Sequence, residues 1–207
     1  IESRKDSYLI SISTDQVYSG KGPHKEENTK PVNIYGKTKH LGEIEIQKIH
    51  AKHLIFRTSW VYSSIYGKNF YRTMLKLFQE KREVKVVNDQ IGNPTSVEFL
   101  SQAIVEILFD LKKDKEARWG LYHLAGDERM SWFEFAKKIY ITEGDKDLLK
   151  TKKILPISST EFKSKVIRPK NSTLNCDLIQ KKFGDIYKKN FFNKSKKTTK
   201  PIFLVYF

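Results

Sequence analysis

Short apolar runs alternate with longer amphipathic segments along this chain. Runs rich in β-branched and aromatic residues, which are typical of buried strands, occur at residues 8–13, 53–62, 84–87 and 120–124. Segments in which apolar side chains recur every three or four residues predict helices at residues 32–50, 70–80, 97–111 and 131–142. Ser131 and Glu134 have the spacing of a capping box at the start of the last helix. This alternation predicts an α/β fold with a parallel sheet.

Other segments break this pattern. A loop rich in glycine and proline separates the first strand from the first helix. Residues 163–175 look irregular, and from Asn190 onward the sequence is rich in Lys and Phe without a clear period. The apolar residues 201–207 follow a run of lysines and weakly predict a terminal strand.

The composition is that of a folded protein with a substantial core. The chain has 207 residues, of which 39% are hydrophobic and 13% aromatic, whereas disordered chains are poor in aromatic residues. Cys176 is the only cysteine, so no internal disulfide can form, which fits a reducing cytoplasm. No apolar run approaches the roughly 18 residues that span a membrane, so we expect no membrane partner.

The net charge of +15 first suggests a nucleic-acid partner, because clustered cations release counterions from phosphate. However, Lys greatly outnumbers Arg, although base and phosphate recognition relies strongly on the bidentate contacts of Arg. The lysines are also spread along the whole chain. A general bias toward Lys explains the charge better, and we expect no nucleic-acid partner. A weak electrostatic attraction of an anionic small substrate stays open.

Tyr35 and Lys39 are the candidate chemical groups of the first helix. Side chains four residues apart share one helix face, and an ammonium held near a phenol favours the phenolate form, which suits proton transfer. Thr14, at the end of the first strand, could complete a three-point grip on a carbonyl group. A solvated helix face with a partly buried tyrosine explains the spacing alone at least as well.

The wider context changes that balance, because the chain resembles the extended short-chain dehydrogenases/reductases and, within them, the dTDP-4-dehydrorhamnose reductase family. The matching segments occur in family order. They are residues 13–15, 35–39, 57–62, 88–95, 120–123 and 168–174.

The resemblance implies an incomplete Rossmann-like, doubly wound parallel sheet with a small C-terminal substrate-binding subdomain. Residues 1–88 would form the C-terminal part of the dinucleotide-binding domain. Residues 89–185 would mainly form the substrate-binding subdomain, interleaved with late sheet elements, and residues 186–207 an atypical tail. The intact enzyme would use NADPH or NADH to reduce the C4 keto group of dTDP-4-dehydro-L-rhamnose. Its product, dTDP-L-rhamnose, is a precursor of cell-surface polysaccharide.

The resemblance also implies roles for the candidate residues. Tyr35 would donate a proton to the C4 carbonyl oxygen and contact the cofactor. Lys39 would hold the nicotinamide ribose, and Thr14 would donate a hydrogen bond to the substrate oxygen. This agrees with the rule that open α/β sheets bind ligands at the carboxyl ends of their strands.

Three further residues match positions on the substrate side. Asp15 and Trp60 would contact the sugar nucleotide, and Arg168 would lie near its diphosphate, where a guanidinium can bind two oxygens at once. From the residues alone, Asp15 could instead cap the following turn, and Trp60 could be an aromatic core residue at a strand end.

The chain departs from the family pattern in two respects. Gln16 stands where these reductases usually carry an aromatic residue and where the related 4,6-dehydratases carry a catalytic glutamate, which disfavours dehydration. In addition, no Gly-x-x-Gly-x-x-Gly follows a predicted strand, although this loop places the cofactor pyrophosphate at a helix N-terminus. We therefore expect an N-terminally truncated copy that binds nicotinamide cofactors poorly.

The expected partner is a nucleotide-sugar substrate. Some such reductases dimerise around a magnesium ion, so the resemblance allows a homodimer with Mg²⁺ at its interface, whereas no metal ligand is expected in the catalytic site itself. Two other readings stay open. They are another sugar-nucleotide reductase or epimerase, and a non-catalytic regulatory subunit of the methionine adenosyltransferase beta type.

Overall fold

The computed structural model describes residues 7–113, 118–143 and 148–192. Its central sheet is formed by β1 (Leu9–Thr14), β2 (His53–Thr58) and β7 (Gly120–His123), which pair in the order β1-β2-β7. Both pairings are parallel, so the predicted parallel sheet is confirmed. The terminal strand expected at residues 201–207 lies outside the described residues, as does most of the expected tail.

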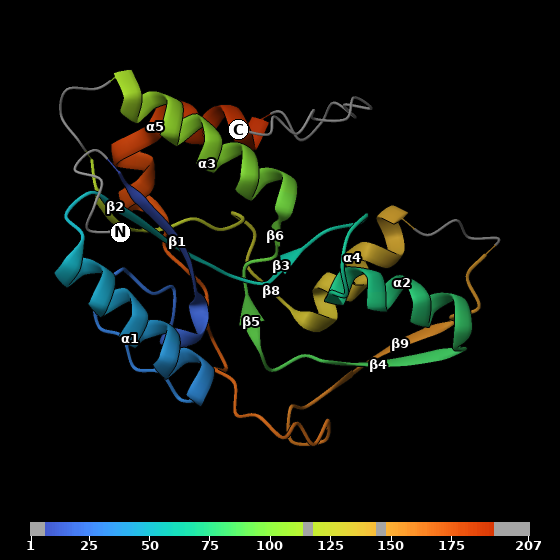
Figure 1. Ribbon diagram of the computed structural model, residues 1–207. Coiled ribbons are helices and arrows are strands. Elements are labelled where there is room, and N and C mark those ends of the chain that lie inside the picture. Colours follow the sequence, from blue (N-terminus) through green and yellow to red (C-terminus); the bar gives the residue numbers. More distant parts are fainter. Residues whose placement is uncertain (1–6, 114–117, 144–147, 193–207) are drawn as a thin grey trace.

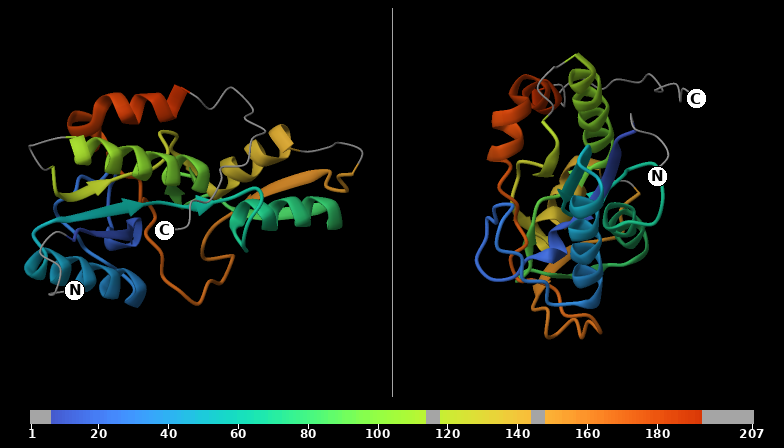
Figure 2. Two further views of the ribbon diagram at one scale, coloured as in Figure 1. Left: turned by 45° about the horizontal axis from the view of Figure 1, so that its top comes forward. Right: turned by 60° about the vertical axis from the view of Figure 1, so that its left-hand side comes forward.

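Helices cover the sheet on both faces, as in a doubly wound fold. Figures 1 and 2 show α1 (Ile34–Ile49) on one face, and α3 (Val97–Lys113) and α5 (Asp177–Phe192) side by side on the other. Leu54 and Phe56 of β2 are fully buried against α3 and α5. None of the described helices is long and apolar enough to cross a membrane.

β1 forms one edge of this sheet among the described residues, since it pairs with β2 alone. Ile10 and Ile12 lie opposite Leu54 and Phe56 in the register and therefore share their face of the sheet. They stay 36% and 41% exposed, because α3 and α5 cover β2 and β7 rather than β1.

A second layer of elements extends from the sheet on the right of Figure 1. There α2 (Phe70–Glu80) and α4 (Trp132–Glu143) pack together over the parallel strands β4 (Glu83–Val87) and β9 (Lys153–Ile157). Two short pairings join this part to the sheet. They are β3 (Val61–Tyr62) with β6 (Thr95–Ser96), and β5 (Ile91–Gly92) with β8 (Met130–Ser131).

The ends of two predicted helices have clear physical causes. Ser131 and Glu134 form the predicted capping box, because the Ser131 N–H donates to Glu134 Oε2 over 2.7 Å and the Glu134 N–H donates to Ser131 Oγ over 3.1 Å. The helix expected from residue 32 begins at Ile34. The reason is Asn33, whose Oδ1 accepts the Gly36 N–H over 2.8 Å and caps the helix.

Other expectations were wrong or incomplete. The single strand predicted at residues 53–62 is two strands, because Trp60 has a φ of 47° and the backbone turns there. β9 was not predicted, since Pro156 interrupts its apolar run, although an edge strand tolerates proline. α5 was also missed, and a non-helical residue at Phe183 divides it into two short pieces.

A buried ion pair joins α1 to the sheet. Arg57 Nη2 lies 2.6 Å from Glu43 Oε2, Arg57 Nε donates to Glu43 Oε1 over 2.9 Å, and both residues are 2% exposed. The Ser13 hydroxyl also donates to this carboxylate. Burial would raise the pKa of Glu43, but the hydrogen bonds and charge of Arg57 outweigh it and hold that pKa below its ordinary value. α1 is thus bound to both β1 and β2 through one carboxylate.

The other side of the guanidinium connects three further segments. Arg57 Nη1 donates to the hydroxyl of Tyr18 and, over 2.6 Å, to the Glu26 carbonyl. Tyr18 Oη lies 2.7 Å from His123 Nε2, and His123 Nδ1 lies 2.9 Å from the Asn175 carbonyl. Burial lowers the pKa of His123 to about 3, so its ring is neutral. Its Nδ1–H donates to Asn175, and its Nε2 accepts from Tyr18.

We expect Arg57→Met to lower the free energy of unfolding by about 3–5 kcal/mol, because it leaves the Glu43 carboxylate buried without its cation. The double variant Arg57→Met/Glu43→Met should lose less free energy of unfolding than Arg57→Met alone. Urea unfolding measures both.

The exposed pair of Lys48 and Glu45, 2.9 Å apart, provides a matched control. Lys48→Met should change stability by less than about 1 kcal/mol. A double variant at residues 43 and 57 that is less stable than Arg57→Met alone would contradict the role of the ion pair.

Candidate functional site

A cavity of about 670 Å³ lies where β1 and β2 end, the place at which open α/β sheets bind ligands. Its polar wall comes from the 3-10 turn η1 (Asp15–Val17) and the start of α1. Its apolar wall comes from α2 and β4, and residues 159–172 form a further wall. The predicted site residues Asp15, Tyr35, Trp60 and Arg168 all line this one cavity.

Tyr35 and Lys39 lie on the first turns of α1. Tyr35 lines the cavity and is 56% exposed. Lys39 Nζ donates to the Ile12 carbonyl of β1 over 2.6 Å. Gly36 lets α1 approach η1 closely, since a Cβ at that position would overlap the carbonyl oxygen of Gln16. The glycine between the two candidates therefore sets the position of Tyr35 beside η1.

Thr14 is placed differently from the expectation. It is 6% exposed and is not among the residues that line the cavity. Its hydroxyl accepts the Gln16 N–H over 3.2 Å and donates to Asp15 Oδ1 over 3.2 Å. Thr14, rather than Asp15, thus caps the turn η1, and its contact with a substrate stays a prediction.

Asp15 is a buried carboxyl at the cavity wall, 3% exposed. Ser172 and Ser59 donate to its Oδ2 over 2.6 and 2.8 Å. Burial raises the pKa of Asp15, and these hydrogen bonds oppose that rise. Ser59 was not singled out from the sequence, because its hydroxyl reaches Asp15 only after β1 and β2 pair.

Trp60 forms an aromatic wall together with Trp132. The two rings stack with centroids 3.4 Å apart and planes 3° from parallel, and both line the cavity. A Cβ at Gly92 would overlap the indole of Trp60, so this glycine makes room for the ring. Sequence reasoning missed Trp132, whose only signal is its position directly after the capping serine of α4.

Arg168 lies on the segment that follows β9, with Ser172 at its end. The start of this segment is also tied, because Asp89 accepts from the Ser159 N–H and the Ser159 hydroxyl, both over 2.8 Å. Arg168 is thus held at the cavity by a segment that is anchored at both ends.

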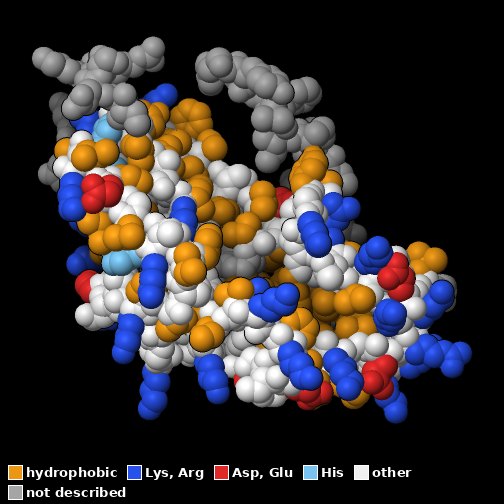
Figure 3. All heavy atoms as spheres, turned by 60° about the horizontal axis from the view of Figure 1, so that its bottom comes forward, with side chains coloured by type: hydrophobic (Ala, Val, Ile, Leu, Met, Phe, Trp, Pro, Cys, Tyr) orange, Lys and Arg blue, Asp and Glu red, His pale blue; other side chains and the backbone are white. Residues whose placement is uncertain are grey.

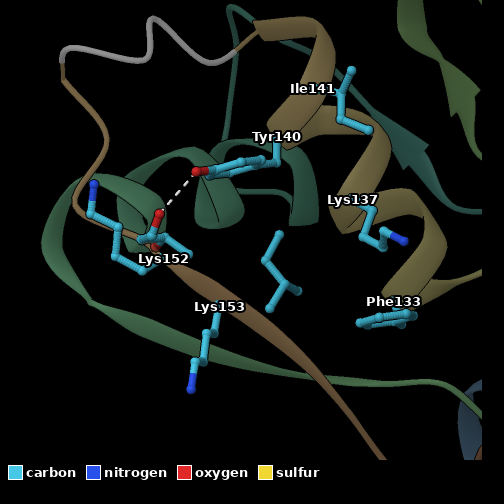
Figure 4. A pocket seen from close by; sticks show the side chains of 8 residues that line it. Phe133, Lys137, Tyr140, Ile141, Lys152 and Lys153 are labelled. Carbon is cyan, nitrogen blue, oxygen red and sulfur yellow. Dashed lines mark hydrogen bonds between the residues drawn. The ribbon is translucent and has the colours of Figure 1, made fainter.

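The charge on the face drawn in Figure 3 marks no second candidate site among the described residues. Lys and Arg side chains are spread over the face drawn in Figure 3, with hydrophobic side chains between them, which fits a general bias toward Lys. A smaller hollow of about 240 Å³ lies between α4 and β9. In Figure 4 the amino groups of Lys137, Lys152 and Lys153 point in different directions, so they do not converge on one anion.

Metal binding has no support from the residues that the structure describes. No group of three or more His, Cys, Asp or Glu side chains among them could hold a metal ion. The expectation of Mg²⁺ at a dimer interface therefore has nothing in its favour here.

We expect Gly92→Ala to displace Trp60 from Trp132, because the added methyl group and the indole would overlap. Near-ultraviolet circular dichroism, which reports coupling between stacked indoles, should lose signal. Gly42→Ala is the matched control, since a Cβ there meets nothing within 4 Å and alanine favours a helix by about 1 kcal/mol. An unchanged spectrum for Gly92→Ala would contradict the role of this glycine.

Comparison with known proteins finds relatives of one family. The family model of the RmlD substrate binding domain matches residues 2–198. The dTDP-4-dehydrorhamnose reductase of Escherichia coli K12 is 39% identical over 183 residues, and that of Sinorhizobium fredii is 37% identical over 180 residues. These matches cover 86% and 85% of this chain, which spans about 60% of the length of either relative.

The fold is also that of solved reductases. A crystal structure of dTDP-4-dehydrorhamnose reductase from Bacillus anthracis in complex with NADP superposes with a TM-score of 0.75 at 34% identity. The superposition covers 91% of this chain and 66% of that one. The predicted α/β, Rossmann-like fold and the family resemblance are both confirmed. The chain belongs to the RmlD substrate binding domain family.

Proposed function

We propose that this chain supplies the proton donor and the substrate-binding residues of a reductase. The reaction is the reduction of dTDP-4-dehydro-L-rhamnose to dTDP-L-rhamnose with NADPH or NADH. The observation that supports it is the convergence of Tyr35, Asp15, Trp60 and Arg168 on one cavity at the carboxyl ends of β1 and β2. The relatives named above are called dTDP-4-dehydrorhamnose reductases, and one of them is solved with NADP.

Tyr35 acts as the general acid in this proposal. When bound, the reduced nicotinamide supplies a hydride to C4 of the sugar. The phenol of Tyr35 donates a proton to the oxygen on that carbon, for which it must come within hydrogen-bond reach. Its position on the cavity wall and its 56% exposure leave the phenol accessible to a ligand.

Lys39 supports the same step through its remaining donors. An ammonium has three N–H donors, and the Ile12 carbonyl accepts one of them. The other donors fit the two hydroxyls of a nicotinamide ribose.

The substrate is held by groups of different chemistry. Ser59 and Ser172 both donate to Oδ2 of Asp15, which leaves Oδ1 to accept from a sugar hydroxyl and from Thr14. Trp60 offers an indole surface to the sugar, and Arg168 offers a planar fork to the diphosphate. For Thr14 to bind the substrate oxygen, its hydroxyl proton must turn away from Asp15.

The activity can be tested in a chimera in which this chain replaces the matching residues of the Escherichia coli relative. We expect NADPH oxidation with dTDP-4-dehydro-L-rhamnose, and a loss of about a hundredfold or more in Tyr35→Phe, because general acid catalysis contributes that much. Tyr66→Phe is the control, since Tyr66 is 72% exposed and does not line the cavity. Full activity of Tyr35→Phe would refute the assignment.

A polypeptide of these 207 residues alone should bind NADPH weakly. Its sequence has no Gly-x-x-Gly-x-x-Gly motif, the loop that places a pyrophosphate against a helix N-terminus. The loss of two charge-assisted hydrogen bonds corresponds to about a hundredfold in affinity. Calorimetric titration beside the Escherichia coli relative measures the difference, and equal affinities would overturn the expectation.

A further inference from the structure

The side-chain amide of Asn33 connects three segments that lie far apart in the sequence. Its Nδ2 donates to Gln16 Oε1 over 3.0 Å and to the Ile167 carbonyl over 3.0 Å. Gln16 belongs to η1, Asn33 precedes α1, and Ile167 precedes Arg168. We call Gln16, Asn33 and the Ile167 carbonyl the amide bridge.

The orientation of Asn33 in the amide bridge is fixed by its partners. Its Oδ1 accepts the Gly36 N–H over 2.8 Å, and its Nδ2 supplies the two donors described above. A flipped amide would lose all three hydrogen bonds. The residue that caps the helix of Tyr35 therefore also holds the residue before Arg168.

Gln16 gives this bridge its particular chemistry in this chain. Its side chain lines the cavity, as Asp15 does. The amide oxygen of Gln16 accepts from Asn33, so the bridge requires an acceptor at this position.

The segment that carries Arg168 depends on hydrogen bonds of this kind to hold its position. Val166 and Ile167 are 50% and 74% exposed, so little apolar burial stabilises them. Ser159 and Ser172 are tied to Asp89 and Asp15 at the two ends, and the bond to Ile167 lies between them. Figure 1 shows this orange segment passing the N-terminal end of α1.

We infer that Gln16 and Asn33 are positioning residues that hold Arg168 where it meets the diphosphate of a nucleotide-linked ligand. This inference rests on the proposed function. Neither residue needs to touch the diphosphate, because both act through the backbone at Ile167. The amide bridge also couples Arg168 to the first turn of α1, so the diphosphate and Tyr35 are placed by one set of contacts.

The first experiment tests the amide bridge by trypsin cleavage, without any ligand. Trypsin should cut after Lys163 and Lys165 several-fold faster in Gln16→Met and in Asn33→Ser than in the unchanged chain. Serine can still cap the helix, so Asn33→Ser removes the bridge and keeps the cap.

Two matched controls test whether the change in cleavage rate is specific to the amide bridge. Gln102→Met removes an exposed glutamine on α3, and Asn69→Ser changes the asparagine that caps α2 in the same way. Neither should change the cleavage rate at Lys163 and Lys165. Equal rates in the unchanged chain, Gln16→Met and Asn33→Ser would overturn the inference.

The second experiment measures binding of dTDP and of thymidine, which lacks the diphosphate, by calorimetry. Gln16→Met and Arg168→Met should each weaken dTDP about tenfold, with little further loss in the double variant, because both act on one contact. Thymidine affinity should not change.

The outcomes separate the two claims. Unchanged dTDP affinity in Gln16→Met, or full additivity with Arg168→Met, would overturn the positioning role. If the unchanged chain bound neither dTDP nor thymidine, the proposed function would fail and with it the diphosphate role of Arg168. The cleavage experiment would still decide whether the amide bridge holds the segment.

Discussion

The buried pair of Arg57 and Glu43 is the interaction on which the site depends most. Two charges removed from water must satisfy each other and almost all their hydrogen-bonding groups, so their partners can occupy few positions. Glu43 lies two turns beyond Tyr35 on the same helix, and Arg57 lies at the end of β2. The pair therefore fixes where α1 crosses the sheet, and that position brings the phenol to the cavity.

Local sequence patterns could predict the parts of this fold that local chemistry determines. The capping box at Ser131 needs only two residues at a fixed spacing, and the strands and helices of the sheet follow from apolar periodicity. β9 depends instead on its pairing with β4, which no pattern within residues 153–157 reveals. The positive φ of Trp60 likewise depends on the stack with Trp132 and the space at Gly92.

The same distinction applies to the candidate site. Family motifs identified Tyr35, Asp15, Trp60 and Arg168, all of which line the cavity. They could not show that the hydroxyl of Thr14 is engaged by Asp15 and Gln16, because that contact depends on the conformation of a short turn. Nor could they show the serines around Asp15, which come from segments 44 and 157 residues away along the chain.

The edge of β1 that no described strand covers has a consequence beyond the site. Leu9 donates its N–H toward β2, so the backbone groups of Ile10 and Ile12 point away from β2, as alternate residues of a parallel strand do. An edge of this kind, next to exposed isoleucines, can pair with a further strand. Lys39 occupies the Ile12 carbonyl, so an added strand would have to displace its ammonium to pair there. The lysine proposed to bind the ribose thus also occupies one backbone acceptor on this edge.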